Sequence, residues 1–409
     1  MHSGIYIAKA WSYPPKLGHY MYRRRVFALC IAAGVALPAS SPATAQTVTT
    51  LTTADASFPE SFSSVRGLRE LPDGRVLIAD GLGQALVIVD IEAGTADTVG
   101  RVGGGPSEYR LPDRLFELPG DSLLLVDLGN GRLTVLDPDL EFGRTYPIMS
   151  ASGEGFGSTT LRLPRGVDGR GRIYYQQTAG IRPGSPVPDS AAVVRWDPAN
   201  DAVDTIAVVK VEERKLETVA DGMRLAQTPL SPQDGWAVGR DGRIALVRSS
   251  DYHVEWMDRD RIVVRGPANP YEPVRIGMAE KEAWVDGRTR DGLSVAIDIG
   301  GGGARQATFS RGSTSGPRFG VDEYTWPDRM QAFDAGGVYI TPNGMLWVQQ
   351  SAKTGADATF DVFDGEGRIT RRVTLPAGRE VVGFGAGVVY TVAADEFDLM
   401  WLERFRVDT

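Results

Sequence analysis

Short runs of apolar residues alternate with Asp/Gly turns along most of the chain, a pattern typical of consecutive β-hairpins. Residues 65–90 and residues 112–137 follow one plan: an apolar strand, a turn, a second apolar strand that ends in Asp80 or Asp127, and a third apolar strand. Glycines in these turns can adopt positive φ, and the aspartates can cap the turn. The repeat length of about 47 residues is typical of propeller blades, each a small antiparallel sheet.

The same rhythm continues through the rest of the chain and predicts six units. The last unit supplies three strands, and residues 48–53, which are rich in β-branched residues, are the candidate for its missing outer strand. We therefore expect an all-β, six-bladed β-propeller closed by the N-terminal strand pairing into the last blade, because closure removes an exposed sheet edge. The six units are Ser63–Gly100, Pro112–Ile148, Leu161–Lys210, Gly235–Gly266, Ala335–Leu375 and the segment from Val381 onward.

Two stretches interrupt the repeat. Residues 211–234 have the composition of a charged connector, and residues 267–334 form a longer insertion. Within the insertion we expect a short helix at residues 279–285 and disorder in the glycine tract at residues 300–303. Long irregular segments in compact domains are either functional or disordered, and the sequence leaves both interpretations open for the rest of the insertion.

Residues 1–45 contain the three parts of a secretory signal. A basic segment after Met21 is followed by the apolar run Val26–Leu37 and by small residues that end at Ala45. This run is too short to span a bilayer core of roughly 30 Å. We expect an upstream extension before Met21, cleavage after Ala45, export to the periplasm or beyond, no membrane insertion, and one monomeric domain at residues 46–409.

Charge and composition exclude several classes of function. The chain carries a net charge of −8, and removal of residues 1–45 would take away five basic residues and no acidic one, leaving −13. So negative a chain is a poor partner for nucleic acid or anionic membranes. The same removal takes the single cysteine, Cys30, and leaves His253 as the single histidine. A cysteine nucleophile and a histidine-rich zinc site are therefore excluded.

Two segments resemble a known family. Residues 124–137, Leu-Leu-Val-Asp-Leu-Gly-Asn-Gly-Arg-Leu-Thr-Val-Leu-Asp, resemble the NHL repeat, and residues 100–112 resemble the glycine-rich signature between the blades of such propellers. Beyond residue 150 the chain shares with the NHL repeat only the alternation of apolar strands and turns. The resemblance implies a bacterial secreted six-bladed propeller of the NHL type, a group in which most members have no assigned reaction.

Candidate ligand-binding residues lie near the start of the first strand of several units. Arg66, Arg114 and Arg165 hold this place in the first three units, and Asp234 and Trp236 hold it in the fourth. Converging guanidinium groups would bind a carboxylate or a phosphate. The three arginines are offset when the repeats are aligned on their turns, and adjacent strand positions face opposite sides. The alternative, favoured on this ground, is that they are separate surface or ion-paired residues.

These observations favour a non-enzymatic module that recognises a protein, a small molecule or a carbohydrate through one propeller face and its long loops, without a cofactor. The alternative is a calcium-dependent, lactonase-like hydrolase with its site at the central channel. Asp80 and Asp127 could serve it as calcium ligands, but their repeated position favours a role as turn caps. Four tryptophans on strands could bind sugars, although packing between blades is the commoner use of such side chains. They are Trp196, Trp256, Trp347 and Trp401.

Overall fold

The computed structural model describes residues 47–151, 159–178, 186–219, 222–299, 305–312 and 320–407. The chain separates into Met1–Ala45 and Gln46–Thr409, and the expected signal segment therefore lies outside the described residues. Among the residues described, no helix has the length and apolar character needed to cross a membrane.

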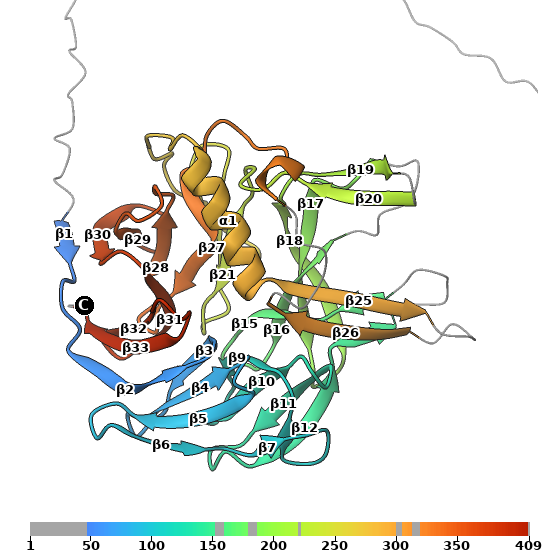
Figure 1. Cartoon of the computed structure of the whole chain (residues 1–409), viewed down its shortest axis with the longest axis vertical. Helices are drawn as coiled ribbons and strands as arrows, with labels where there is room; N and C mark the ends of the chain where they lie inside the picture. The colour runs from blue at the N-terminus through green and yellow to red at the C-terminus, as the bar shows by residue number, and fades with distance from the viewer. Residues whose placement is uncertain are drawn as a thin grey trace, which may run out of the picture. The chain divides into compact units, whose positions relative to one another are not determined.

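Six antiparallel sheets surround a central axis, as Figure 1 shows, and the expected six-bladed propeller is confirmed. In each blade the strands follow one another from the centre outward. The first blade contains β3 (Val65–Glu70), β4 (Val76–Asp80), β5 (Ala85–Asp90) and β6 (Thr95–Thr98). The second contains β9 (Pro112–Glu117), β10 (Leu123–Asp127), β11 (Arg132–Leu136) and β12 (Phe142–Pro147). The third contains β15 (Pro164–Val167), β16 (Ile173–Thr178), β17 (Ser190–Asp197) and β18 (Ala202–Lys210).

The other three blades repeat this order. The fourth contains β21 (Gly235–Val238), β22 (Ile244–Arg248), β23 (His253–Met257) and β24 (Val263–Arg265). The fifth contains β27 (Phe333–Ile340), β28 (Leu346–Gln350), β29 (Ala358–Phe363) and β30 (Ile369–Leu375). The sixth contains β31 (Arg379–Gly385), β32 (Val388–Ala394), β33 (Met400–Arg406) and, on its outer edge, β2 (Ala56–Phe62).

The hydrophobic core is divided among the spaces between neighbouring blades. Leu77 and Leu86 of the first blade pack with Leu115 and Leu125 of the second, and five further clusters of buried apolar residues join the other neighbouring pairs in the same way. Three of the four strand tryptophans, Trp196, Trp256 and Trp347, are buried in or beside these clusters, whereas Trp401 is partly exposed. Packing between blades is therefore the role of those three.

The N-terminal segment closes the last blade, as expected, but through a different strand. β2 pairs antiparallel with β33 and carries the buried side chains of Phe58 and Phe62, which pack between the sixth and first blades. The expectation that residues 48–53 form this outer strand is wrong. β1 (Thr47–Thr50) instead pairs in parallel with β30, on the edge of the fifth blade. Pro59 makes the sequence of β2 a weak strand candidate, but an edge strand tolerates a proline.

The connecting segments contain more regular structure than the sequence indicates. Residues 211–234 are not a plain connector, because β19 (Arg214–Val219) and β20 (Gly222–Gln227) form a hairpin there.

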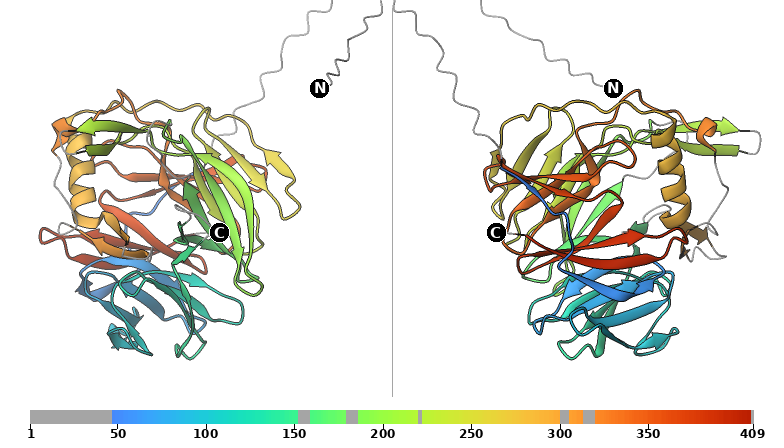
Figure 2. Two further views of the ribbon diagram at one scale, coloured as in Figure 1. Left: turned by 90° about the vertical axis from the view of Figure 1, so that its right-hand side faces the viewer. Right: turned by 60° about the vertical axis from the view of Figure 1, so that its left-hand side comes forward.

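In the insertion the expected helix is confirmed, and it is longer than expected, as α1 (Met278–Asp291). β25 (Leu293–Ile299), β26 (Arg305–Arg311) and the 3₁₀ helix Val321–Glu323 follow it; the glycine tract 300–303 lies outside the described residues. Figures 1 and 2 show α1 and the β25–β26 hairpin on one face of the ring. Two small sheets complete the described part of the fold. One joins β7 (Arg101–Val102) and β8 (Glu108–Tyr109), and the other joins β13 (Met149–Ala151) and β14 (Thr159–Leu161).

The assignment of β2 as the closing strand predicts unequal effects for two substitutions. Phe62→Ala should lower the free energy of unfolding by roughly 3–5 kcal/mol, because it leaves a cavity between the first and last blades. Val48→Ala is the matched control: Val48 lies on β1 and is 60% exposed, so its loss should change stability by at most about 0.5 kcal/mol. Denaturant unfolding of both variants measures this, and a larger loss for Val48→Ala would contradict the assignment.

Candidate functional site

A cavity of about 1390 Å³ runs along the axis of the ring. It is lined by the innermost strand of every blade, namely β3, β9, β15, β21, β27 and β31, and by residues of the β25–β26 hairpin. These strands contact one another around the ring, and the hydroxyl of Tyr339 on β27 donates a 3.5 Å hydrogen bond to the carbonyl of Val381 on β31. The cavity is therefore the central channel of the propeller.

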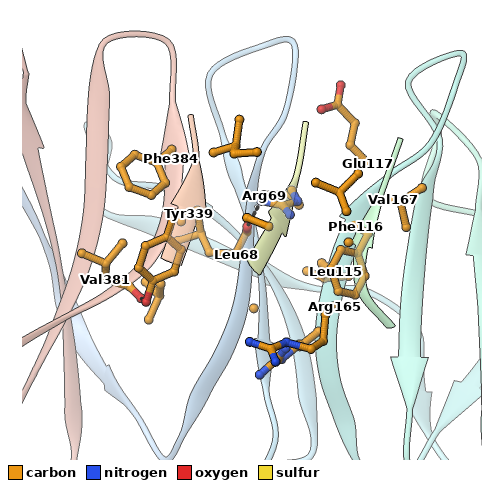
Figure 3. A pocket seen from close by; sticks show the side chains of 18 of the residues that line it. Leu68, Arg69, Leu115, Phe116, Glu117, Arg165, Val167, Tyr339, Val381 and Phe384 are labelled. Carbon is orange, nitrogen blue, oxygen red and sulfur yellow. Dashed lines mark hydrogen bonds between the residues drawn. The ribbon is translucent and has the colours of Figure 1, made fainter. Parts of the chain in front are cut away.

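The middle of the channel is apolar. Leu68, Leu115, Val167, Val338 and Val381 line it from five blades, and all five side chains are buried. Figure 3 shows several of these residues on neighbouring inner strands, between charged side chains that lie further along the channel on either side. We refer to these five residues as the apolar belt.

Arginines gather where the inner strands begin. Arg66, Arg114 and Arg165 all line the channel at this end, and Arg311 reaches it from the β25–β26 hairpin. We refer to these four as the mouth arginines. The charge of Arg114 acts on both Arg165 and Arg311, and that of Arg66 acts on Arg311, so each mouth arginine lies within electrostatic reach of at least one other. The structure thus brings together the three arginines that alternation along a strand would separate.

β-Bulges explain why alternation misleads here. A β-bulge inserts an extra residue into one strand and re-aims a side chain, and bulges are common beside functional sites. In each of the three strands the pairing register shifts at the arginine. The shifts lie between Val65 and Gly67 in β3, between Pro112 and Leu115 in β9 and between Pro164 and Gly166 in β15.

Arg165 is held in place by Gln176 of its own blade and by Trp236 of the fourth blade. Its guanidinium lies 5.1 Å from the centre of the Trp236 ring, and Nη1 donates to Oε1 of Gln176 at 3.3 Å. The same oxygen accepts a hydrogen bond from Nε1 of Trp236 at 3.2 Å, so one amide orients both side chains. Burial and the positive charge of Arg114 lower the pKa of Arg165 to about 10, although the negative charge of Asp334 opposes them.

Arg311 is the mouth arginine that the sequence does not indicate. It forms a buried ion pair with Asp113, and its side chain is 10% exposed. Burial lowers the pKa of Arg311, and the charges of Arg66 and Arg114 lower it further, against the attraction of Asp113. Two other carboxylates, Asp334 and Glu380, line the same end of the channel and are exposed.

The remaining candidates divide between the channel and the scaffold. Trp236 lines the channel and is buried. Asp234 does not line it: its carboxylate accepts hydrogen bonds from the backbone and hydroxyl of Ser249 at 2.9 Å and pairs with Arg248 at 3.0 Å. Burial opposes ionisation of Asp234, but hydrogen bonds from Ser249, Lys210 and Arg248 outweigh it and hold its pKa below the ordinary value.

The repeated aspartates act as turn caps. Asp80 accepts backbone hydrogen bonds from Ser63, Ser64 and Gly83 at 2.8–2.9 Å. Asp127 is fully buried and accepts 3.1 Å and 2.7 Å hydrogen bonds from the backbone of Arg110 and the amide of Asn130. Across the described residues, no group of three or more His, Cys, Asp or Glu side chains could hold a metal ion.

Comparison with known proteins gives structural likeness alone. No family model matches the chain, including any for the NHL repeat, and no curated protein matches it. Among solved structures, one of a gluconolactonase from Xanthomonas campestris has 12% identity, covers 86% of this chain and 91% of that one, and has a TM-score of 0.40. A putative exported protein from Bacteroides fragilis has 12% identity, covers 89% and 100% of the two chains, and has a TM-score of 0.41. A putative gluconolactonase has 14% identity, covers 88% and 96%, and has a TM-score of 0.40. Nothing about activity follows from likeness this distant.

The turn-cap role of Asp127 can be tested against a role in calcium binding. Asp127→Ala should lower the free energy of unfolding by about 3 kcal/mol, because it leaves the hydrogen-bond donors around Asp127 without an acceptor. Asp137→Ala, which removes an exposed cap that accepts from Asp139 and Glu141, should cost about 1 kcal/mol or less. Calcium should leave the unfolding midpoint of the unaltered protein unchanged. A calcium-dependent rise in that midpoint that Asp127→Ala abolishes would contradict the turn-cap role.

Proposed function

We propose that this protein is an exported, non-enzymatic binding propeller whose central channel holds a small organic anion, with a carboxylate or phosphate group at the mouth arginines. The proposed export rests on the signal-like features of residues 1–45. The proposed ligand class rests on one observation: four arginines from three blades and the insertion line one end of the same cavity, each within electrostatic reach of at least one other.

Grouping these arginines costs free energy, and a bound anion would offset that cost. Like charges repel, and burial disfavours the charged form of each group, as the lowered pKa values of Arg165 and Arg311 indicate. Perturbed titratable groups gathered in a cavity mark a candidate functional site. Of the three carboxylates at this end, Asp113 already pairs with Arg311, so positive charge remains in excess.

The chemistry of the lining defines the class of ligand further. Guanidinium groups bind carboxylates and phosphates through two parallel hydrogen bonds. Beyond the mouth, the channel wall is formed by the apolar belt, whose side chains are at most 9% exposed, and this wall would contact an apolar ligand body. An acidic head group with an apolar body therefore fits the channel better than a neutral sugar does.

The alternative, a calcium-dependent lactonase-like hydrolase, needs a set of oxygen ligands around the axis. At this end of the channel the lining carboxylates are Asp113, Asp334 and Glu380, the first of them paired with Arg311. Four arginines beside them oppose the binding of a divalent cation. The charge of the channel mouth therefore favours an anion over calcium.

Substitution of Arg165 tests the proposal. Octanoate and octyl phosphate should bind to the purified protein in calorimetry and raise its unfolding midpoint, whereas 1-octanol, which lacks the charge, should bind more weakly. Arg165→Met should weaken binding of both anions at least roughly tenfold, because a charge-assisted contact is lost.

The matched control for this experiment is Arg101→Met. Arg101 is 76% exposed and lies outside the channel lining, and its loss changes the net charge by the same amount. It should leave both affinities unchanged. Equal weakening by the two variants would indicate nonspecific electrostatic attraction, and failure of every anion to bind would contradict the proposed function.

A further inference from the structure

A fifth arginine lies deeper in the same channel. Arg69 is three residues beyond Arg66 on β3, which corresponds to roughly 10 Å along an extended strand. Both side chains line the cavity. Figure 3 shows Arg69 and Arg165 at different levels of the channel, with Leu68 and Leu115 of the apolar belt between them.

No carboxylate pairs with Arg69 among the residues that the structure describes. Its Nη1 donates a 3.3 Å hydrogen bond to the carbonyl of Leu68, and its guanidinium carbon lies 6.0 Å from the centre of the Phe116 ring. Its Nε is buried without a hydrogen-bond partner, which costs free energy. Burial, followed by the positive charge of Arg240, lowers the pKa of Arg69 to about 10.

Two acidic residues on the inner strands β3 and β9, Glu70 and Glu117, line the channel and have partners of their own. Glu70 accepts hydrogen bonds from the hydroxyl of Tyr390 at 2.7 Å and from the backbone of Ala386 at 3.3 Å, both in the sixth blade. Glu117 pairs with Arg240. Arg69 is therefore a half-buried cation that lines the cavity, and none of the described residues supplies its counter-charge.

We propose that the channel binds an elongated dianion, with one acidic group at the mouth arginines, an apolar spacer along the apolar belt and the second acidic group at Arg69. This inference rests on the proposed anion-binding function, because it assigns the position of a second charge on the same ligand. The order cation, apolar belt, cation along the channel supports it. The chemical class is an α,ω-dicarboxylate, or a phosphate ester with a distant carboxylate.

A homologous series of ligands distinguishes the contributions of the two acidic groups of the ligand. Straight-chain α,ω-dicarboxylates from succinate to dodecanedioate are titrated into the purified protein, beside the monocarboxylates of the same chain lengths. Each pair shares nearly the same apolar surface, so the hydrophobic contribution largely cancels within the pair. The dicarboxylate should bind at least roughly tenfold more tightly once the chain spans roughly 10 Å, and should show no such advantage when it is shorter.

Arg69→Met should remove the advantage of the long dicarboxylates and leave the monocarboxylates unchanged, while Arg69→Lys, which keeps the charge, should retain part of it. Arg69→Gln provides the same comparison if Arg69→Met does not fold. Two results would overturn the second anion position at Arg69 and leave the proposed function standing. In the first, monocarboxylates bind through Arg165 but dicarboxylates of every length bind no more tightly. In the second, the higher affinity of the long dicarboxylates survives the loss of Arg69. Absence of binding by either series overturns both.

Discussion

The pairing of β2 with β33 is the interaction on which the rest of the structure depends. It joins residues from the two ends of the described chain and places Phe58 and Phe62 between the last blade and the first. Asp55 reinforces it through ion pairs with Arg404 at 2.6 Å and Arg406 at 3.1 Å. Without this closure the first and sixth blades would expose their facing apolar surfaces, and the inner strands would no longer surround one cavity.

Closure also determines the chemistry of the channel. Arg66, Arg114 and Arg165 come from three different blades, and β-bulges at the start of their strands direct them to one mouth. The insertion adds Arg311 to the same place. Under the proposed function, this cluster of positive charge in a chain of net charge −8 would attract small anions to the channel. Asp113 already pairs with Arg311 and lies 4.0 Å from Arg114, and a bound anion would add to this compensation.

Sequence patterns predict the scaffold well because its determinants are local. Apolar strands and Asp/Gly turns located all six blades to within a few residues, and Asp80 and Asp127 occupy the cap positions that their repetition indicates. The sequence assigns the closing strand to the wrong segment for two reasons. Pro59 lowers the strand propensity of β2, and the β-branched residues of β1 give it the composition expected of a closing strand. Parallel pairing of β1 with the fifth blade has no local signature.

The candidate site is harder to predict, because it depends on contacts between distant segments. Alternation predicts that the arginines diverge, and the β-bulges reverse this. The Arg-Gly pairs Arg66-Gly67 and Arg165-Gly166 are the one available signal, since each glycine allows close approach of the next inner strand. Arg311 and Arg69 have no such signal. Arg311 lies in the insertion, outside the repeat, and Arg69 has the sequence context of any polar residue near the end of a strand.

The most direct test of the account is an anomalous difference map from crystals of the protein soaked in sodium selenate. Selenate has the shape and charge of an acidic head group, and its selenium atom reveals where the anion binds. If the channel binds anions, the strongest peak should lie inside it, within hydrogen-bond distance of the Arg165 guanidinium and beside Arg114. Selenate bound at surface arginines such as Arg101, with the channel free of anomalous density at the same concentration, would contradict it.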